Sequence, residues 1–199
     1  MIIFPETRDD LQEDENLRDN FKMPSDLRSP MAFLKRRISN AVEIREVSKD
    51  KKQYLALLMS ADEQEDMIDR YIERGRMFVL WDDGAKGECV ITDEGNGVLE
   101  IKNIAVLSEY RRKGYGRVLI DFIISRYEKK YTTLQVGTGD SPMTVPFYEK
   151  CGFVKSHEIK DFFIDNYDHP IYEAGVRLKD MIYLRRSLSG REDNEQRGE

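Results

Sequence analysis

Residues 98–127 read VLEIKNIAVLSEYRRKGYGRVLIDFIISRY. The first part, Val98 to Val106, is predicted as a long strand. From Tyr115 to Tyr131 apolar residues recur at helical spacing, which predicts an amphipathic helix. A further strand is expected at Thr133 to Val136. A strand, a helix and a second strand in this order indicate a parallel β-α-β unit.

The residues before this unit have the pattern of antiparallel strands joined by tight turns. Three segments are predicted as strands, because their apolar and polar residues alternate or because turn residues follow them: 43–47, 77–81 and 88–92. Residues 52–59 are expected to form a helix. A second helix is expected to start at the capping box Ser60-Ala61-Asp62-Glu63 and to end at Gly75.

The residues after the unit close the sheet. Ser141-Pro142 is expected to open a last helix that Gly152 ends, although Pro146 moves the expected start toward Val145. Two closing strands are expected at 153–157 and 181–184. The predicted fold class is therefore α/β, more narrowly α+β. Its central mixed sheet has six to seven strands, an antiparallel first half, a parallel β-α-β middle and helices on both faces.

The predicted domain covers residues 43–186. Residues 1–42 are a largely polar extension, and acidic residues outnumber basic ones by eight to three within residues 1–26. Such a composition cannot bury a core. Residues 30–39 have the spacing of a short amphipathic helix, and residues 187–199 are expected to be a flexible polar tail.

Charge and cysteine content exclude several classes of function. The 199 residues include 38 acidic and 32 basic side chains, for a formal charge of −6. Nucleic acids and anionic membranes are therefore unfavoured partners, because both need a basic surface. The two cysteines and two histidines lack metal-ligand spacing, so no metal is expected. No apolar run approaches the ~18 residues of a membrane span. The N-terminus lacks the basic region of a signal peptide. We expect a soluble, cytoplasmic protein.

The loop RRKGYGR, residues 111–117, has the features of a diphosphate site. It lies between a predicted strand and a predicted helix, where backbone N–H groups lack partners and the helix dipole is positive. Two glycines allow the main chain to approach a ligand, and four cations surround them. The loop does not match the Walker P-loop, and it lacks the third glycine of the dinucleotide fingerprint.

Three ordered motifs resemble the GNAT superfamily of CoA-dependent N-acetyltransferases. They are R-x-x-G-x-G at Arg111 to Gly116, the preceding Asn103-Ile104-Ala105-Val106, and PFYEKCGF at Pro146 to Phe153. The resemblance extends over about residues 43–186. Residues 166–180 are also similar, more weakly, to bacterial GNAT proteins grouped with aminoglycoside 6′-N-acetyltransferases.

The resemblance implies acetyl-CoA as cosubstrate, entering between the fourth and fifth strands near Val136 and Gly137. Main-chain groups of Ile104, Ala105 and Val106 would pair with pantetheine. In the place of a family asparagine, Ser141 would contact the pantetheine arm or leave that contact unmade. The diphosphate would be bound by the loop residues Arg111, Arg112, Lys113, Gly114, Tyr115, Gly116 and Arg117.

The resemblance also implies two proton-transfer residues. Glu100, eleven residues before Arg111, matches a glutamate base of several family members, and the alternative is a surface carboxylate paired with Lys102. Regular alternation would place Glu100 on the same side of the strand as Ile104 and Val106, whereas a bulge there would change the register. Other acids left open as bases are Glu46, Asp82 and Asp140.

Tyr148 matches the family's tyrosine acid, which protonates the CoA thiolate; its alternative role is a core aromatic beside Phe147 and Phe153. The expected function is transfer of an acetyl group from acetyl-CoA directly to a primary amine of a small molecule or peptide. The alternatives are an inactive acyl-CoA-binding sensor and an interaction protein with the same fold. A homodimer is compatible with the sequence.

Overall fold

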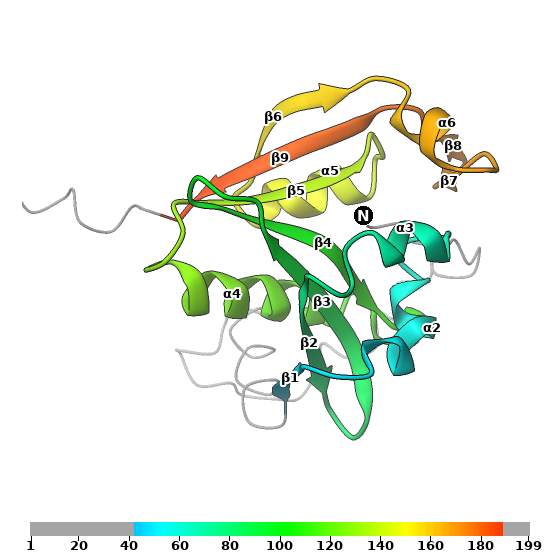
Figure 1. The fold of residues 1–199 in the computed structure, drawn as a ribbon. Coiled ribbons are helices and arrows are strands. Elements are labelled where there is room, and N and C mark those ends of the chain that lie inside the picture. Colours follow the sequence, from blue (N-terminus) through cyan, green and yellow to red (C-terminus); the bar gives the residue numbers. More distant parts are fainter. Residues whose placement is uncertain (1–41, 189–199) are drawn as a thin grey trace, which may run out of the picture.

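A seven-stranded sheet crosses residues 42–188, the part of the chain that the computed structural model describes (Figure 1). Neighbouring strands are antiparallel except β4 and β5, which are parallel. In spatial order the strands are β1 (Glu43–Val47), β2 (Arg76–Trp81), β3 (Ala85–Asp93), β4 (Val98–Val106), β5 (Thr133–Gly139), β9 (Met181–Ser187) and β6 (Val154–Ile159). The predicted mixed sheet, with its antiparallel first half and parallel middle, is confirmed.

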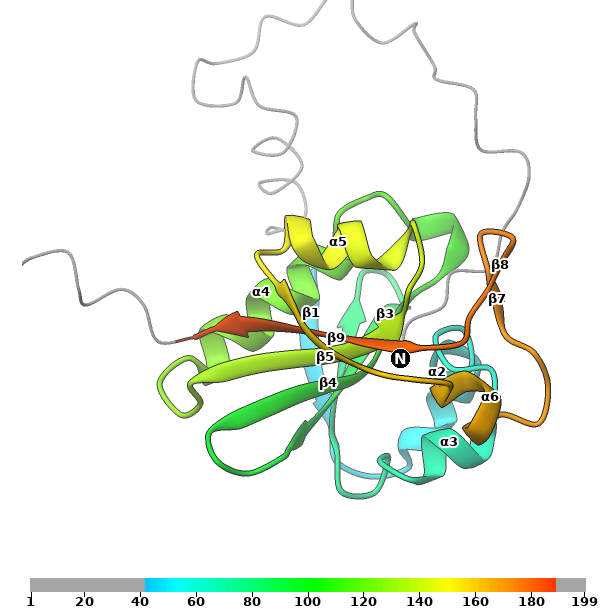
Figure 2. The ribbon, with the colours of Figure 1, turned by 90° about the horizontal axis from the view of Figure 1, so that it is seen from above.

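Helices cover both faces of the sheet, as Figure 2 shows. One face carries the two longest, α4 (Tyr115–Tyr127) and α5 (Thr144–Lys150). The opposite face carries shorter segments: η3 (Lys51–Tyr54), α2 (Leu55–Leu58), α3 (Glu65–Asp69) and α6 (Phe162–Asn166). The remaining elements are η4 (Ser108–Tyr110) and a small hairpin of β7 (Tyr172–Glu173) and β8 (Val176–Arg177).

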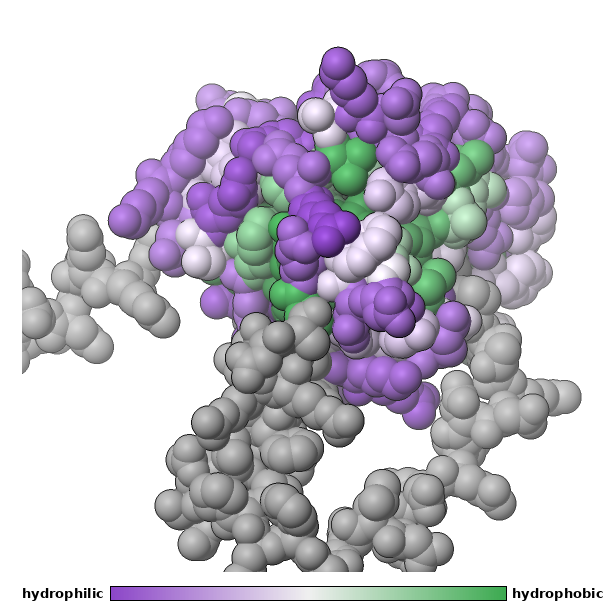
Figure 3. All heavy atoms as spheres, turned by 90° about the horizontal axis from the view of Figure 1, so that it is seen from below, coloured by the Kyte–Doolittle hydropathy of each residue, from purple (hydrophilic) through white to green (hydrophobic). Residues whose placement is uncertain are grey.

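The core has a part on each face. On the α4 side, Leu119, Ile120 and Ile123 are fully buried against the strands. On the other side, Leu58 and Ile68 are fully buried in a second cluster. Burial of this apolar surface supplies most of the favourable free energy that holds the helices to the sheet. The outer surface in Figure 3 is largely hydrophilic, with apolar residues gathered near the middle of that face.

Several predicted helix boundaries are wrong. The capping box at Ser60 starts no helix: its Oγ donates to the carbonyl oxygen of Leu57 at 2.7 Å and ends the preceding turn. The following helix begins at Glu65 and ends at Asp69, six residues before Gly75. The long helix ends at Tyr127 rather than Tyr131, because a turn leads from there into β5.

The last helix begins at Thr144, close to the start that Pro146 favours. Gly152 ends it with a φ of 84°, as the sequence predicts. The predicted extension of residues 1–42, its helix at 30–39 and most of the tail lie outside the described residues. Among residues 42–188, no helix is both long and apolar enough to cross a membrane.

Candidate active site

The β4–β5 pair separates halfway along β4. The two strands pair from Val98 with Thr133 to Ile101 with Val136. Beyond Ile101, β4 keeps its pairing with β3 only, while β5 pairs with β9. One side of β4 beyond Ile101 therefore has no strand paired with it, inside the sheet rather than at its margin.

A bulge in β4 lies at the point of separation. Asn103 pairs with Val90 and Ile101 with Ile91, which leaves Lys102 as the extra residue. The bulge reverses the alternation of side chains, so of the two alternatives the changed register is the one present, and Glu100 does not share a face with Ile104 and Val106. Ile104 and Val106 join the core beneath α4, whereas Glu100 lines a pocket on the opposite face.

The predicted cofactor residues of β4 form the open edge. Ile104, Ala105 and Val106 pair with Cys89, Glu88 and Gly87 of β3, and their other side is the one left by β5. The carbonyl oxygen of Val106 accepts a hydrogen bond from Nε of Arg111 at 3.1 Å. The guanidinium of Arg111 is half-buried, and this burial lowers its pKa.

The basic loop leads from β4 into the N-terminus of α4. Gly114 is the N-cap residue with a φ of 89°, and Arg112 also has a positive φ of 58°. The N–H groups of the first turn, from Tyr115 to Arg117, have no partner within the helix. This places backbone donors at the positive end of a 13-residue helix, which is the geometry that binds anions.

The side chains of this loop divide into exposed and anchored groups. Arg112 and Lys113 are exposed. Arg117 is anchored, because its Nε donates to Oδ1 of Asp121 at 3.0 Å and its Nη1 donates to the carbonyl oxygen of Lys150 at 2.8 Å. Two cations therefore remain at the surface next to the backbone donors.

Tyr148 and Ser141 lie on the α5 side of the gap. Tyr148 is fully buried between the rings of Phe147 and Phe153, and its hydroxyl has no hydrogen-bond partner among the described residues. Burial raises the pKa of Tyr148 well above its ordinary value, so the group holds its proton. Ser141 is buried, and its Oγ accepts the backbone N–H of Met143 at 3.1 Å.

Glu100 is buried at the point where β4 and β5 separate. Lys102 Nζ donates to one carboxylate oxygen at 2.7 Å, and Gln135 Nε2 donates to the other at 2.6 Å. The predicted pairing with Lys102 is therefore present. The expected surface location is wrong, because only 5% of Glu100 is exposed.

The three other acids considered as bases lie elsewhere. Glu46 is exposed on β1 and binds Arg76 at 2.8 Å. Asp82 accepts the hydroxyl of Tyr115 beside α4. Asp140 is exposed and pairs with Lys155 at 3.4 Å. None of these three carboxylates lines the pocket that contains Glu100.

That pocket, here called the acceptor pocket, has a volume of about 220 Å³ on the face of α3 and α6. Strands β4, β5 and β9 form its floor, and the segments around α3 and α6 form its walls. It is lined by Asp62, Met67, Arg70, Tyr71, Arg74, Glu100, Ile101, Lys102, Gly137, Phe162, Tyr167, Met181 and Tyr183.

Asp62 is a pocket residue that sequence reasoning missed. It is 2% exposed and accepts the hydroxyl of Tyr167 at 2.9 Å and that of Tyr71 at 3.5 Å. Burial raises its pKa. The sequence pattern around Ser60 assigned Asp62 to a helix cap, and its partner Tyr167 is 105 residues away. No local signal links the two.

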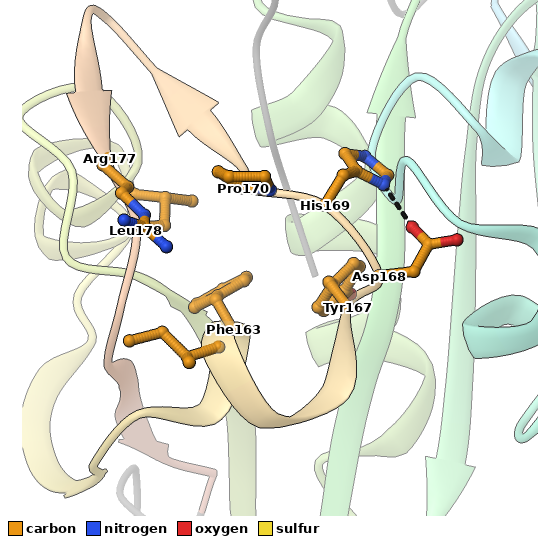
Figure 4. Close-up of a pocket in the computed structure, with 8 residues that line it drawn as sticks. Phe163, Tyr167, Asp168, His169, Pro170, Arg177 and Leu178 are labelled. Carbon is orange, nitrogen blue, oxygen red and sulfur yellow. Dashed lines mark hydrogen bonds and ion pairs between the residues drawn. The ribbon is translucent and has the colours of Figure 1, made fainter.

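A second cavity of about 210 Å³ lies on the outer side of α6 (Figure 4). Phe163 and Tyr167 form one wall, while His169 and Arg177 come from the following loop and from β8. His169 is exposed and bonded to the carboxylate of Asp168, which raises its pKa. Among residues 42–188, no three His, Cys, Asp or Glu side chains gather as metal ligands.

The family model of the acetyltransferase (GNAT) domain matches residues 73–155. A Bacillus subtilis (strain 168) protein named uncharacterised N-acetyltransferase YvbK is 36% identical over 131 residues, which cover 64% of this chain and 84% of that protein.

Two solved structures agree with this relationship. The GNAT family acetyltransferase of Elizabethkingia anophelis, solved with acetyl-CoA bound, has a TM-score of 0.70 and 31% identity over 74% of this chain and 99% of its own. A Bacillus subtilis acetyltransferase in complex with CoA has a TM-score of 0.68 and 32% identity over 73% and 98%. Identity of this extent, together with the divided sheet, shows that the chain belongs to the GNAT family of acetyltransferases.

Proposed function

We propose that the protein transfers an acetyl group from acetyl-CoA directly to the primary amine of a small molecule or peptide. The observation that carries the proposal is the open backbone edge of β4, which leads into the positive N-terminus of α4. The relatives crystallised with acetyl-CoA or CoA support the same cosubstrate here.

The chain offers separate groups to each part of that molecule. Backbone N–H groups of residues 111–117 would bind the diphosphate, with Arg112 and Lys113 adding surface charge. Backbone groups of residues 104–106 would pair with the pantetheine amides as an added strand does. The Oγ of Ser141 already accepts an internal N–H, so its hydroxyl proton and one lone pair would be left for the cofactor.

Proton transfer would use groups on both faces of the sheet. In the acceptor pocket, Glu100 would take a proton from the acceptor ammonium, which must lose it to become a nucleophile. On the other face, Tyr148 would give its proton to the departing thiolate. The Tyr148 hydroxyl is buried, holds its proton and has no hydrogen-bond partner in the described part of the chain, so that proton would be available to the thiolate.

The second candidate function is an acyl-CoA-binding sensor without transfer. One observation favours it: both carboxylate oxygens of Glu100 already accept hydrogen bonds, from Lys102 and Gln135. Neither oxygen is therefore free to approach an acceptor unless one of these two hydrogen bonds breaks. The third candidate, an interaction protein, depends on residues 30–39, which lie outside the described residues.

Calorimetry followed by an amine screen tests the proposal. Acetyl-CoA and desulfo-CoA should bind with dissociation constants on the order of micromolar, and ATP, which lacks pantetheine, should bind much more weakly. Amine acetylation should then rise with pH along one basic limb. Tight binding with no acetylation of any amine would favour the sensor, and no binding would contradict both functions.

A further inference from the structure

The acceptor pocket contains both signs of charge, and most of that charge is neutralised within the protein. Glu100 and Lys102 pair at 2.7 Å. Arg74 pairs with Glu94 at 2.8 Å. The two remaining charged residues of the lining are Asp62 and Arg70.

Asp62 is a buried carboxylate whose observed partners are neutral. Its side chain accepts two tyrosine hydroxyls, those of Tyr167 and Tyr71. Within residues 42–188, no lysine, arginine or histidine nitrogen lies within 4.0 Å of it. A buried carboxylate is strongly stabilised by a cation that reaches it, because the low local dielectric strengthens the attraction.

Arg70 is the complementary group at the rim. Its Nη1 donates to Oδ1 of Asn166 at 3.0 Å, a neutral amide, and it makes no ion pair in the described part of the chain. Arg70 also acts on the tyrosine that donates to Asp62: burial raises the pKa of Tyr167, and the positive charge of Arg70 opposes that rise. Arg70 and Asp62 therefore line the same pocket as Tyr167, and neither forms an ion pair with another side chain of residues 42–188.

On the basis of the proposed function, we propose that the acceptor is a small amino acid and that the pocket recognises both its amine and its carboxylate. Its ammonium binds Asp62 next to Glu100, and its carboxylate binds Arg70. A guanidinium can hold a carboxylate with two parallel hydrogen bonds, which fixes the orientation of the bound molecule.

The size and lining of the pocket narrow the class of acceptor to amino acids with an apolar side chain. Its volume of about 220 Å³ lies below the ~300–1,000 Å³ of pockets that bind drug-sized molecules. The lining also contains the apolar side chains of Met67, Phe162 and Met181. An amino acid with an apolar side chain fits this combination, whereas a polyamine would bring a second cation against Arg70.

Matched acceptors test the proposal by the release of CoA thiol from acetyl-CoA. Phenylalanine, phenylalaninamide and phenethylamine share the amine and the ring, and only phenylalanine carries a carboxylate. We expect kcat/KM for phenylalanine, or for leucine in the same type of series, to exceed that of its two analogues by at least about tenfold. Comparable or higher activity on the amide, the decarboxylated amine or spermidine overturns the inference and leaves the proposed function intact. No activity on any amine overturns the proposed function itself.

Variants of Arg70 test whether this residue causes the preference for an acceptor with a carboxylate. The Arg70→Gln variant should raise KM for phenylalanine more than KM for phenethylamine, so the ratio of the two kcat/KM values should fall. The Arg70→Glu variant should instead favour diamines. The control is Arg45→Gln, an exposed arginine on β1 that pairs with Glu43 and lies outside the pocket. An unchanged preference in Arg70→Gln, with the control also unchanged, would contradict the role of Arg70.

Discussion

Among single residues, Glu88 is the carboxylate most deeply buried in the sheet. It lies in the middle of β3, fully buried, and neither of its oxygens has a hydrogen-bond partner among the described residues. Burial raises its pKa from the ordinary 4.5 to about 8. At neutral pH the side chain is therefore held mainly as the neutral acid, and its ionisation opposes folding.

The sign of the resulting pH dependence follows from this raised pKa. Between pH 4.5 and about 8 the unfolded chain has lost the proton that the folded chain keeps. The free energy of unfolding should fall as pH rises through this window, by up to about 1.4 kcal/mol per pH unit. In urea unfolding, the free energy of unfolding should fall less between pH 6 and pH 8 for Glu88→Gln than for the parent. The exposed Glu128→Gln is the control, and an identical loss in all three proteins would contradict the assignment.

Tyr148 offers a second test at this scale. The Tyr148→Phe variant removes only a hydroxyl without an observed partner, so the fold should be as stable as that of the parent or more so. We expect kcat to fall by about 10- to 100-fold, because the thiolate loses its proton donor, while the affinity for acetyl-CoA changes little. Steady-state kinetics together with calorimetry separates the two effects. An unchanged kcat would remove Tyr148 from the mechanism.

The sequence predicts some of these residues and misses others for a physical reason. The pairing of Glu100 with Lys102 is local, so it was open to prediction; its burial depends on Gln135, which is 35 residues away. Asp62 and Arg70 depend on Tyr167 and Asn166 at the C-terminal end of α6, about 100 residues further along the chain. Residue types and spacing contain no information on such contacts.

At the scale of elements, prediction succeeded where the pattern is long and periodic. The strand at 98–106 has the predicted bounds, and the helix that starts at Tyr115 has the predicted start. The helices on the acceptor face are only four or five residues long. Helices this short are not stable by themselves, and packing rather than local sequence sets their ends. Ser60 shows the same limit, because its hydroxyl closes a turn instead of capping a helix.

Gly114 is the element-scale position where a change should affect cofactor binding. The Gly114→Asp variant adds a side chain and a negative charge at the N-cap of α4, where the φ is 89°. The dissociation constant of acetyl-CoA in calorimetry should rise by more than about tenfold, equivalent to about 1.4 kcal/mol.

The matched control is Gly95→Asp in the β3–β4 turn. Gly95 has a similar φ of 80° and no atom within 4 Å of an added Cβ. Its backbone strain and its added charge are therefore comparable, while its position is outside the loop. Equal affinities in the two variants would show that the loop does not bind the cofactor.

At the scale of the whole molecule, the order of the strands could not be read from the sequence. β9 lies between β5 and β6, so the segment after β6 must leave the sheet and return. On the way it forms α6, which is followed by the pocket residue Tyr167, and the β7–β8 hairpin, whose Glu173 accepts a buried hydrogen bond from Thr144 at 3.1 Å. From the sequence, the flanking strands at 153–157 and 181–184 are expected, and no helix or strand is expected between them.

Both cysteines report on the integrity of the whole domain. Cys89 and Cys151 are free and at most 1% exposed, and burial raises the pKa of both thiols. A thiol reagent such as DTNB should react with neither in the folded protein and with both after unfolding in urea, because the reactive thiolate is both disfavoured and covered. Rapid labelling of either cysteine without denaturant would contradict the packing on the α4 side.

The interior edge of β4 has a consequence for how such a protein diversifies. Residues 104–106 offer their main chain on the side that β5 has left, and every amino acid except proline presents the same pattern of donors and acceptors there. Substitutions that reshape the acceptor pocket on one face therefore leave this hydrogen-bonding pattern in place. An open edge enclosed within a sheet is also shielded from the strands of neighbouring molecules. A lineage carrying this sheet can change what it modifies while keeping the donor it uses, without gaining an exposed strand that promotes aggregation.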